Sequence, residues 1–309
     1  MKKLLCVILG ALLLAGCGKS QPEAASVETT QAAVTPEPTP EGVYVLQEQI
    51  YYDAKDRQSV AMTVSFDAKK LPTTIFMDSG ADVTYTLTYA DNGTVTGFTM
   101  VRTLYGEDTT SSALVNDHGD IISKTADGKT SNIAYSYDQS GHVIKKETFV
   151  GENLSSVKAW AYDSQGNLTE ASSTDANGGY KLIYENTYDG QLLTSVHCKF
   201  DGGDTEHTES FTYDQEGKLT QWTQVSGEET TVTIYTYNKQ GLVETETAQL
   251  NGEEYSRQEY TYDDLGRLTE KKTYNSGQYQ GRTTYSWTTE TVQLTAAQQN
   301  ILKQLGALL

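Results

Sequence analysis

Cysteine and histidine are the side chains of this 309-residue sequence best suited to nucleophilic or metal chemistry. Cys198 directly follows His197, and a thiol becomes a strong nucleophile only when a histidine or another positive group activates it. Neighbouring residues of a strand point to opposite faces, so these two side chains are not expected to form a catalytic pair. The four histidines also lack the spacing of metal ligands. We therefore expect Cys198 to be a buried, inert thiol and the chain to hold no metal.

Two acidic segments resemble loops with known chemistry. Residues 78–80 read Asp-Ser-Gly, as in retroviral-type aspartic proteases, where two such aspartates share one proton. The sequence has a single copy and lacks the apolar segment that follows it in those enzymes. Residues 175–178 show only part of the alternating oxygen pattern of a calcium-binding loop. Hairpin turns explain both segments, and we predict a protein that is not an enzyme and uses no cofactor.

Most of the chain consists of copies of a short motif, Tyr-Asp-x-x-Gly-x-Leu, that recurs about every 25 residues. Clear copies begin at Tyr137, Tyr162, Tyr213 and Tyr262, and weaker copies begin at Tyr89, Val115, Tyr188 and Tyr237. Degenerate copies are expected at Phe66-Asp67 and near Trp287. A fixed period of this size indicates a repeat architecture, in which each unit buries its apolar side against its neighbours.

The motif has the residues of a tight turn. Asp214 at the first position and Gly217 at the fourth suit a type I turn whose last residue is left-handed. The Asp214 carboxylate can accept hydrogen bonds from backbone N–H groups two residues further on. The turn sets the register and places Tyr213 opposite Leu219. The same rule pairs Tyr89 with Val95, Val115 with Ile121, Tyr137 with Val143, Tyr162 with Leu168 and Tyr262 with Leu268.

A second turn signal lies midway through each unit, for example Gly227-Glu228 and Asn251-Gly252. Each unit is therefore expected to contain two strands of seven to nine residues, rich in Thr, Tyr and Val. Two short turns leave no room for a crossover helix, so the strands must run antiparallel. The predicted fold is all-β, an antiparallel meander of β-hairpin repeats that forms one long curved or spiralling sheet.

Aromatic residues often lie two positions before the motif tyrosine, as Phe211 and Tyr260 do. A spacing of two places both rings on one face of the sheet. Two interpretations stay open. We favour the buried face of a curling sheet, and the alternative is a platform that stacks on sugars.

Trp222 is the candidate ligand-stacking residue. By the register above, its side chain points away from Tyr213 and Leu219. An exposed tryptophan could stack on a sugar or on a protein partner. Val232 and Ile234 are expected to share its face on the next strand, so a second small apolar cluster is the alternative.

The repeat resembles the YD repeat of the rearrangement-hotspot (RHS) family and of teneurins. Residues 257–269, RQEYTYDDLGRLT, match the fuller family pattern R-x-x-Y-x-Y-D-x-x-G-R-L-T almost throughout. The resemblance covers about residues 66–290 and implies a long antiparallel sheet that spirals or curves. In large family members such sheets enclose a cargo or present surfaces for adhesion and carbohydrate binding. This chain resembles a short member without the core region or a toxin domain, and the motif carries no catalytic residue.

The N-terminus has the organisation of an export signal. Two lysines precede the apolar run 4–14, which is too short to span a bilayer. Residues 14–17, Leu-Ala-Gly-Cys, resemble a bacterial lipobox, which implies cleavage before Cys17 and lipid attachment to it. The stretch that follows is rich in proline, lacks aromatic residues and is expected to be a disordered linker. The predicted location is the bacterial cell envelope, with the protein lipid-anchored through Cys17 and extracytoplasmic.

Charge and the C-terminal tail complete the prediction. A formal net charge of −18 repels nucleic acid, so no nucleic-acid partner is expected. From Thr295, a helix cap, the tail has helical spacing through Ile301, Leu302, Leu305 and Leu309. We predict a short C-terminal helix that covers the last open edge of the sheet.

Four segments and one function follow from these observations. The segments are a lipoprotein signal peptide at 1–16, the lipidated cysteine and linker at 17–42, the β-repeat domain at 43–290 and the C-terminal helix at 291–309. We expect a non-catalytic binding protein, anchored in the membrane by lipid, whose ligand is a carbohydrate or an envelope protein. The alternative is an envelope scaffold or assembly lipoprotein that docks a partner through a sheet edge or the C-terminal helix.

Overall fold

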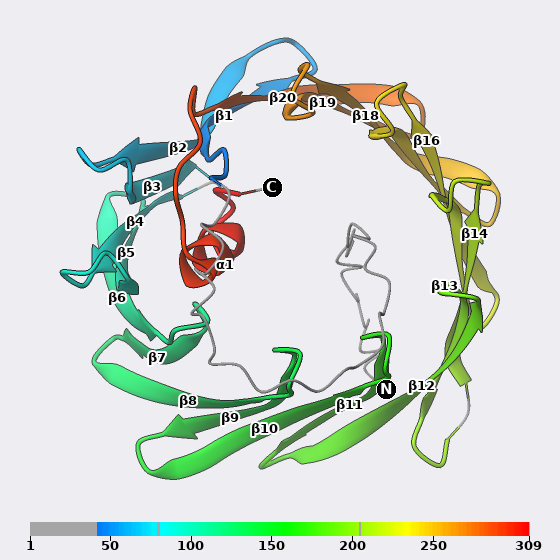
Figure 1. The fold of residues 1–309 in the computed structure, drawn as a ribbon, viewed down its shortest axis with the longest axis horizontal. Coiled ribbons are helices and arrows are strands. Elements are labelled where there is room, and N and C mark those ends of the chain that lie inside the picture. The colour runs from blue at the N-terminus through cyan, green and yellow to red at the C-terminus, as the bar shows by residue number, and fades with distance from the viewer. Residues whose placement is uncertain (1–41, 79–80, 204, 309) are drawn as a thin grey trace, which may run out of the picture. The chain divides into compact units, whose positions relative to one another are not determined.

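The computed structural model describes residues 42–78, 81–203 and 205–308 (Figure 1). The predicted signal peptide, Cys17 and the linker up to residue 41 lie outside the described residues. The described part contains strands β1 Leu46–Asp53, β2 Gln58–Phe66, β3 Pro72–Asp78, β4 Asp82–Tyr89, β5 Val95–Leu104, β6 Glu107–Val115, β7 Ile121–Ala126, β8 Lys129–Tyr137, β9 Val143–Val150, β10 Asn153–Tyr162, β11 Leu168–Asp175, β12 Gly178–Asp189, β13 Leu192–Phe200, β14 Thr205–Tyr213, β15 Leu219–Ser226, β16 Glu229–Tyr237, β17 Val243–Leu250, β18 Glu253–Tyr262, β19 Leu268–Asn275, β20 Gln278–Trp287 and helix α1 Ala296–Gln304.

The strands form one antiparallel sheet that closes on itself (Figure 1). Consecutive strands are paired throughout, and β1 pairs with both β2 and β20. Closure therefore leaves no free edge among the described strands. The predicted all-β antiparallel meander is confirmed, although the strands range from 6 to 12 residues and vary more in length than expected.

The motif turns have the predicted geometry. Gly217 has a φ of +80°, a conformation that glycine adopts without steric cost. Asp214 Oδ1 accepts hydrogen bonds from the backbone N–H groups of Glu216 at 3.0 Å and Lys218 at 2.8 Å. Tyr213 pairs with Leu219 as predicted. The other predicted pairs are also confirmed, namely Tyr89–Val95, Val115–Ile121, Tyr137–Val143, Tyr162–Leu168 and Tyr262–Leu268.

Charged neighbours reinforce some of these turns. The side chain of His142 bonds to Asp138 at 2.9 Å and, with backbone N–H groups, holds the pKa of that carboxyl below its usual value. The His142 ring also stacks on Tyr162, with ring centroids 4.7 Å apart. Burial opposes ionisation of Asp263, but hydrogen bonds from the backbone and side chain of Arg267 outweigh it and lower the pKa of Asp263.

In most units the motif aromatic residue also bonds to the preceding unit. The Tyr213 hydroxyl donates to the carbonyl oxygen of Leu193 at 2.7 Å, and the Tyr262 hydroxyl donates to that of Val243 at 2.9 Å. The last, degenerate unit keeps the contact with a different donor, because Trp287 Nε1 donates to the carbonyl oxygen of Leu268 at 2.7 Å. Equivalent bonds to carbonyl oxygens of the preceding unit come from Tyr89, Tyr162 and Tyr237.

Helix α1 begins where the sequence predicts, with a capping box in which Thr295 and Gln298 bond to each other's backbone N–H groups. Its predicted position over a sheet edge is wrong, because β1 and β20 pair with each other and leave no edge to cover. The helix lies inside the closed sheet instead (Figure 1), where Ile301 and Leu302 are each 1% exposed. Polar side chains of this helix region bond to turn carbonyls on the sheet: Gln298 to Gly93, Asn300 to His118 and Gln304 to Gly119.

Replacing Tyr262 with phenylalanine should lower the free energy of unfolding by about 0.5–1.5 kcal/mol, because the substitution removes the hydrogen bond to Val243 and keeps the ring. Urea unfolding of the purified protein measures this change. The matched control is Tyr105→Phe, at a position that is 98% exposed, and it should leave stability unchanged. Equal effects of the two substitutions would contradict a stabilising role for the motif hydroxyl.

Candidate functional site

The face of the sheet that carries the motif tyrosines points to the inside of the closed sheet, the side on which α1 lies (Figure 1). Tyr89 and Trp287 pack against the buried cluster that contains the α1 residues Ile301 and Leu302. Side chains two positions apart along a strand share a face, so the paired aromatic residues of the motif lie on this inner face. The predicted common face of each aromatic pair is confirmed.

Trp222 also belongs to the inner face, and its predicted orientation is wrong. The register shifts by one residue between Thr212 and Tyr213, so that Thr212 pairs with Gln221 while Tyr213 pairs with Leu219. Thr220 is the extra residue, and it returns Trp222 to the face of Tyr213. The structure pairs Trp222 directly with Phe211 on β14 and with Thr233 on β16. Val232 and Ile234, on either side of Thr233, therefore lie on the opposite face from Trp222.

The same bulge occurs in most units and defines a recurring inner-face pair. One member lies two residues before the motif tyrosine, and the other lies three residues after the motif aliphatic residue. In the unit of Trp222 these are Phe211 and Trp222. The other units place here Leu87 and Phe98, Ala113 and Lys124, Tyr135 and Lys146, Trp160 and Ala171, Asn186 and Val196, Tyr235 and Glu246, and Tyr260 and Lys271. Because the turn does not depend on this pair, its residue types are free to vary with function.

A reading of the sequence with strict alternation of inward and outward side chains misses this pair, because the bulge adds one residue to the strand. A recognisable signal was the third residue after each motif aliphatic position, which is aromatic or charged in most units. Side chains at these positions also form hydrogen bonds with the pair of the neighbouring unit. The Tyr260 hydroxyl donates to the Glu246 carboxylate of the preceding unit at 3.0 Å, and burial together with this carboxylate raises the pKa of Tyr260.

A polar network surrounds Trp222. Trp222 Nε1 donates to Glu209 Oε2 at 2.9 Å, and His207 Nε2 lies 3.0 Å from the other oxygen of the same carboxylate. Cys198 pairs with His207 across the strands and is 0% exposed, which confirms the predicted buried thiol. The network fixes one edge of the Trp222 indole while the side chain stays only partly buried.

Two lysines face each other on the inner side of β9 and β10. Lys146 and Lys158 pair directly, which places their Cβ atoms roughly 5 Å apart. Lys146 Nζ lies 5.5 Å from the centre of the Tyr135 ring. Neither ammonium has an ion-pair partner in the described part of the chain. The neighbouring Lys145 points to the outer face and pairs with Glu147 at 2.8 Å.

The inner face is covered unevenly. The buried apolar cluster around α1 draws its strand residues from β1–β7, β19 and β20. Within the described ranges, no residue of β8–β18 belongs to that cluster. Tyr180, on the inner face of β12 by its pairing with Ser173, remains 46% exposed. The inner face of β8–β18 therefore presents the aromatic and charged side chains of the recurring pairs, and it is the candidate binding surface.

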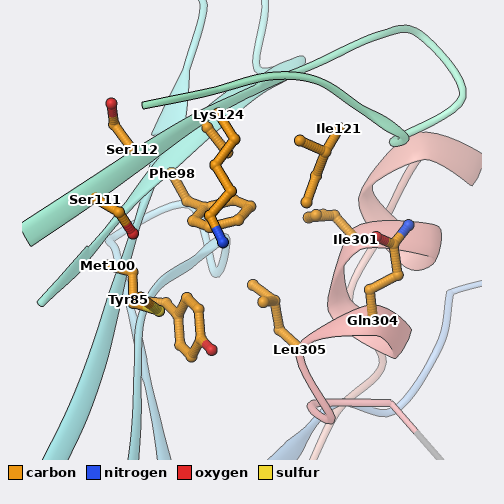
Figure 2. Close-up of a pocket in the computed structure, with 11 residues that line it drawn as sticks. Tyr85, Phe98, Met100, Ser111, Ser112, Ile121, Lys124, Ile301, Gln304 and Leu305 are labelled. Atoms are coloured by element: carbon orange, nitrogen blue, oxygen red, sulfur yellow. The ribbon is translucent and has the colours of Figure 1, made fainter. Parts of the chain in front are cut away.

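A cavity of about 190 Å³ lies on the covered side, between α1 and the inner face of β4–β7 (Figure 2). Figure 2 shows Lys124 extending over it from β7, opposite Ile301 and Leu305 of the helix region. Tyr85 and Phe98 form its aromatic wall, with ring centroids 5.6 Å apart in an edge-to-face arrangement.

Other candidates from the sequence have structural explanations. Asp78 and Asp82 pair across the β3–β4 hairpin, and residues 79–80 lie outside the described part. The segment 175–178 forms the β11–β12 hairpin, where Asp175 Oδ1 accepts from the Asn177 N–H at 2.7 Å. Over the described ranges, no three His, Cys, Asp or Glu side chains gather in a way that could hold a metal ion. The one described helix is too short to cross a membrane.

Comparisons with known proteins give distant similarities only. No family model and no curated protein matches the chain. A porin-like protein from Bacteroides uniformis is 13% identical, covers 81% of this chain and 99% of its own length, and has a TM-score of 0.40. A porin-like protein from Bacteroides vulgatus is 10% identical, with 79% and 100% covered and a TM-score of 0.29. The Tc holotoxin pore of Photorhabdus luminescens is 18% identical over 70% of this chain and 13% of the matched chain, with a TM-score of 0.37.

At identities and TM-scores this low, these similarities do not assign the chain to a family. The resemblance to the RHS and teneurin repeats stays a prediction that rests on the motif residues. The structure confirms the hairpin geometry that those residues imply.

Replacing Lys158 with glutamate should raise the free energy of unfolding by about 0.2–1 kcal/mol at low salt, because the substitution turns a directly opposed pair of like charges into an ion pair with Lys146. Urea unfolding at low and high salt measures the gain, which should shrink as salt screens it. Lys145→Glu is the control, since it breaks the outer pair with Glu147 and should not stabilise. A gain from both substitutions would show that the effect is one of net charge.

Proposed function

We propose that this protein is a lipid-anchored, extracytoplasmic binding protein that acts without catalysis and holds a carbohydrate or an envelope protein against the inner face of β8–β18. The observation that carries the proposal is the recurring inner-face pair, which presents Trp222, Phe211 and Tyr135 on a surface that the apolar cluster around α1 leaves uncovered. The motif itself is occupied with turn formation and contacts between units, so ligand recognition falls to these variable positions.

Stacking on a partly buried ring suits a sugar face or an apolar side chain of a partner. The Trp222 indole is preorganised for stacking, because its hydrogen bond to Glu209 restricts the rotation of the side chain in the free protein. The strongly acidic composition, with a formal net charge of −18, disfavours nucleic acid as the ligand. Membrane attachment through lipid on Cys17 rests on the lipobox-like sequence alone, and that residue lies outside the described part of the structure.

Neither of the two docking elements expected for a scaffold is exposed in the described residues. A sheet edge is not available in the described strands, because β1 and β20 close the sheet. The C-terminal helix has its apolar side buried inside the sheet, with Ile301 and Leu302 each 1% exposed. A scaffold role would therefore have to use the outer face or the hairpin tips, and we favour the binding function.

Binding is tested with a glycan array and with capture from solubilised cell envelopes, using the purified protein and Trp222→Ala. Loss of one aromatic contact should weaken binding roughly 2- to 13-fold, as expected for about 0.5–1.5 kcal/mol. Tyr105→Ala, at an exposed hairpin tip, is the matched control and should bind as the unchanged protein does. No ligand in either assay, or equal losses in both variants, would contradict binding at the inner face.

Lipid attachment is tested by growing cells that express the protein with a radiolabelled fatty acid. The label should appear on the unchanged protein and disappear in Cys17→Ser, because the lipobox-like sequence implies that this thiol is the attachment site. Label retained by Cys17→Ser would overturn the anchor at that residue.

A further inference from the structure

The cavity beneath α1 lies where one repeat unit has a small residue in place of a ring. At the inner-face position two residues before the motif tyrosine, other units carry Tyr135, Phe211 or Tyr260. The β6 unit has Ala113 at this position, opposite Lys124. The small Ala113 side chain leaves open space beside Lys124. Ile301 of α1 lines the opposite side of this space.

Apolar and aromatic groups line most of this cavity (Figure 2). Tyr85, Phe98 and Met100 form the wall from β4 and β5, and Ile121 and Leu305 face them from β7 and the end of the helix region. A cavity of about 190 Å³ is large enough for one ring-sized apolar group, since apolar cavities of about 150 Å³ accept benzene in proteins. Tyr85 and Phe98 already meet edge to face and can receive a further ring in the same manner.

Lys124 brings the only cation to this lining. No carboxylate of the described residues pairs with it, although acidic residues outnumber basic ones 41 to 23 in the chain. An ammonium beside apolar surface gains most from an anion that also shields that surface. The neighbouring polar side chains on the inner side, Ser111 and Gln304, are neutral and can donate to the same anion.

We propose that this cavity is a binding site for a small monocarboxylate with an apolar, ring-sized body. The apolar body fills the space that Ala113 leaves, and the carboxylate pairs with Lys124 at the open side. A ligand with a single negative charge fits better than a phosphate ester, because one lysine is the only cation of the lining. This site is separate from the inner face of β8–β18, so it stands or falls independently of the proposed function.

The test titrates the purified protein with 3-phenylpropanoate, followed by isothermal calorimetry and by ligand-observed NMR. The neutral probe 3-phenylpropan-1-ol has the same ring and should bind at least roughly tenfold more weakly, as expected for loss of a charged hydrogen bond. Lys124→Gln should weaken 3-phenylpropanoate to the level of the alcohol, and Lys124→Arg should retain most of the binding. Lys145→Gln is the control, because Lys145 lies on the outer face of β9, outside both the cavity and the inner face, and this variant should bind as the unchanged protein does.

A second variant tests the cavity itself. Ala113→Phe supplies the ring that other units carry and should abolish binding of both probes, and thermal unfolding monitors whether the variant stays folded. Absence of 3-phenylpropanoate binding to the unchanged protein would overturn the proposal. Equal affinity for acid and alcohol, or equal losses in Lys124→Gln and Lys145→Gln, would overturn the role of Lys124.

Discussion

Most units of the sheet are joined to the preceding one by a donor on the motif aromatic residue, and the unit of Val115 is an exception. The hydroxyls of Tyr213 and Tyr262, and the indole N–H of Trp287, reach back to a main-chain carbonyl of the unit before. Local turn bonds such as those of Asp214 fold one hairpin, whereas this contact adds a bond between neighbouring units beyond the backbone ladder. Repetition of a similar contact favours a similar rotation of each unit relative to its neighbour, and a regular rotation allows a sheet to close.

Closure has two consequences for the rest of the structure. It pairs β1 with β20 and removes the exposed edges that a long open sheet would present to other chains. It also turns the motif face inward, where α1 and the buried cluster fill one side. The helix is held by amides that bond to turn carbonyls, as Gln298 does to Gly93, so the same turns that shape the sheet also position its internal helix.

Within each unit, the positions that form the fold differ from the positions that are available for binding. Tyrosine, aspartate and glycine of the motif are committed to the turn and to the contact between units. The bulge after the motif aliphatic residue then brings a second, uncommitted pair to the inner face, such as Phe211 with Trp222 or Ala113 with Lys124. Variation at that pair creates an aromatic surface in one region and a cavity in another without disturbing the sheet.

The sequence by itself determined the strands, their antiparallel order, the register at the motif turns and the cap of the C-terminal helix at Thr295. These features depend on interactions between residues a few positions apart, so their residue types reveal them. Only the tertiary structure decided that the sheet closes, that α1 lies inside it, and that Trp222 faces inward. Closure is the sum of small rotations over twenty strands, and the face of Trp222 depends on one extra residue, Thr220, in the backbone ladder. A summed rotation leaves no distinct residue type in the sequence, and the bulge is indicated only by the aromatic or charged residue three positions after the motif aliphatic residue.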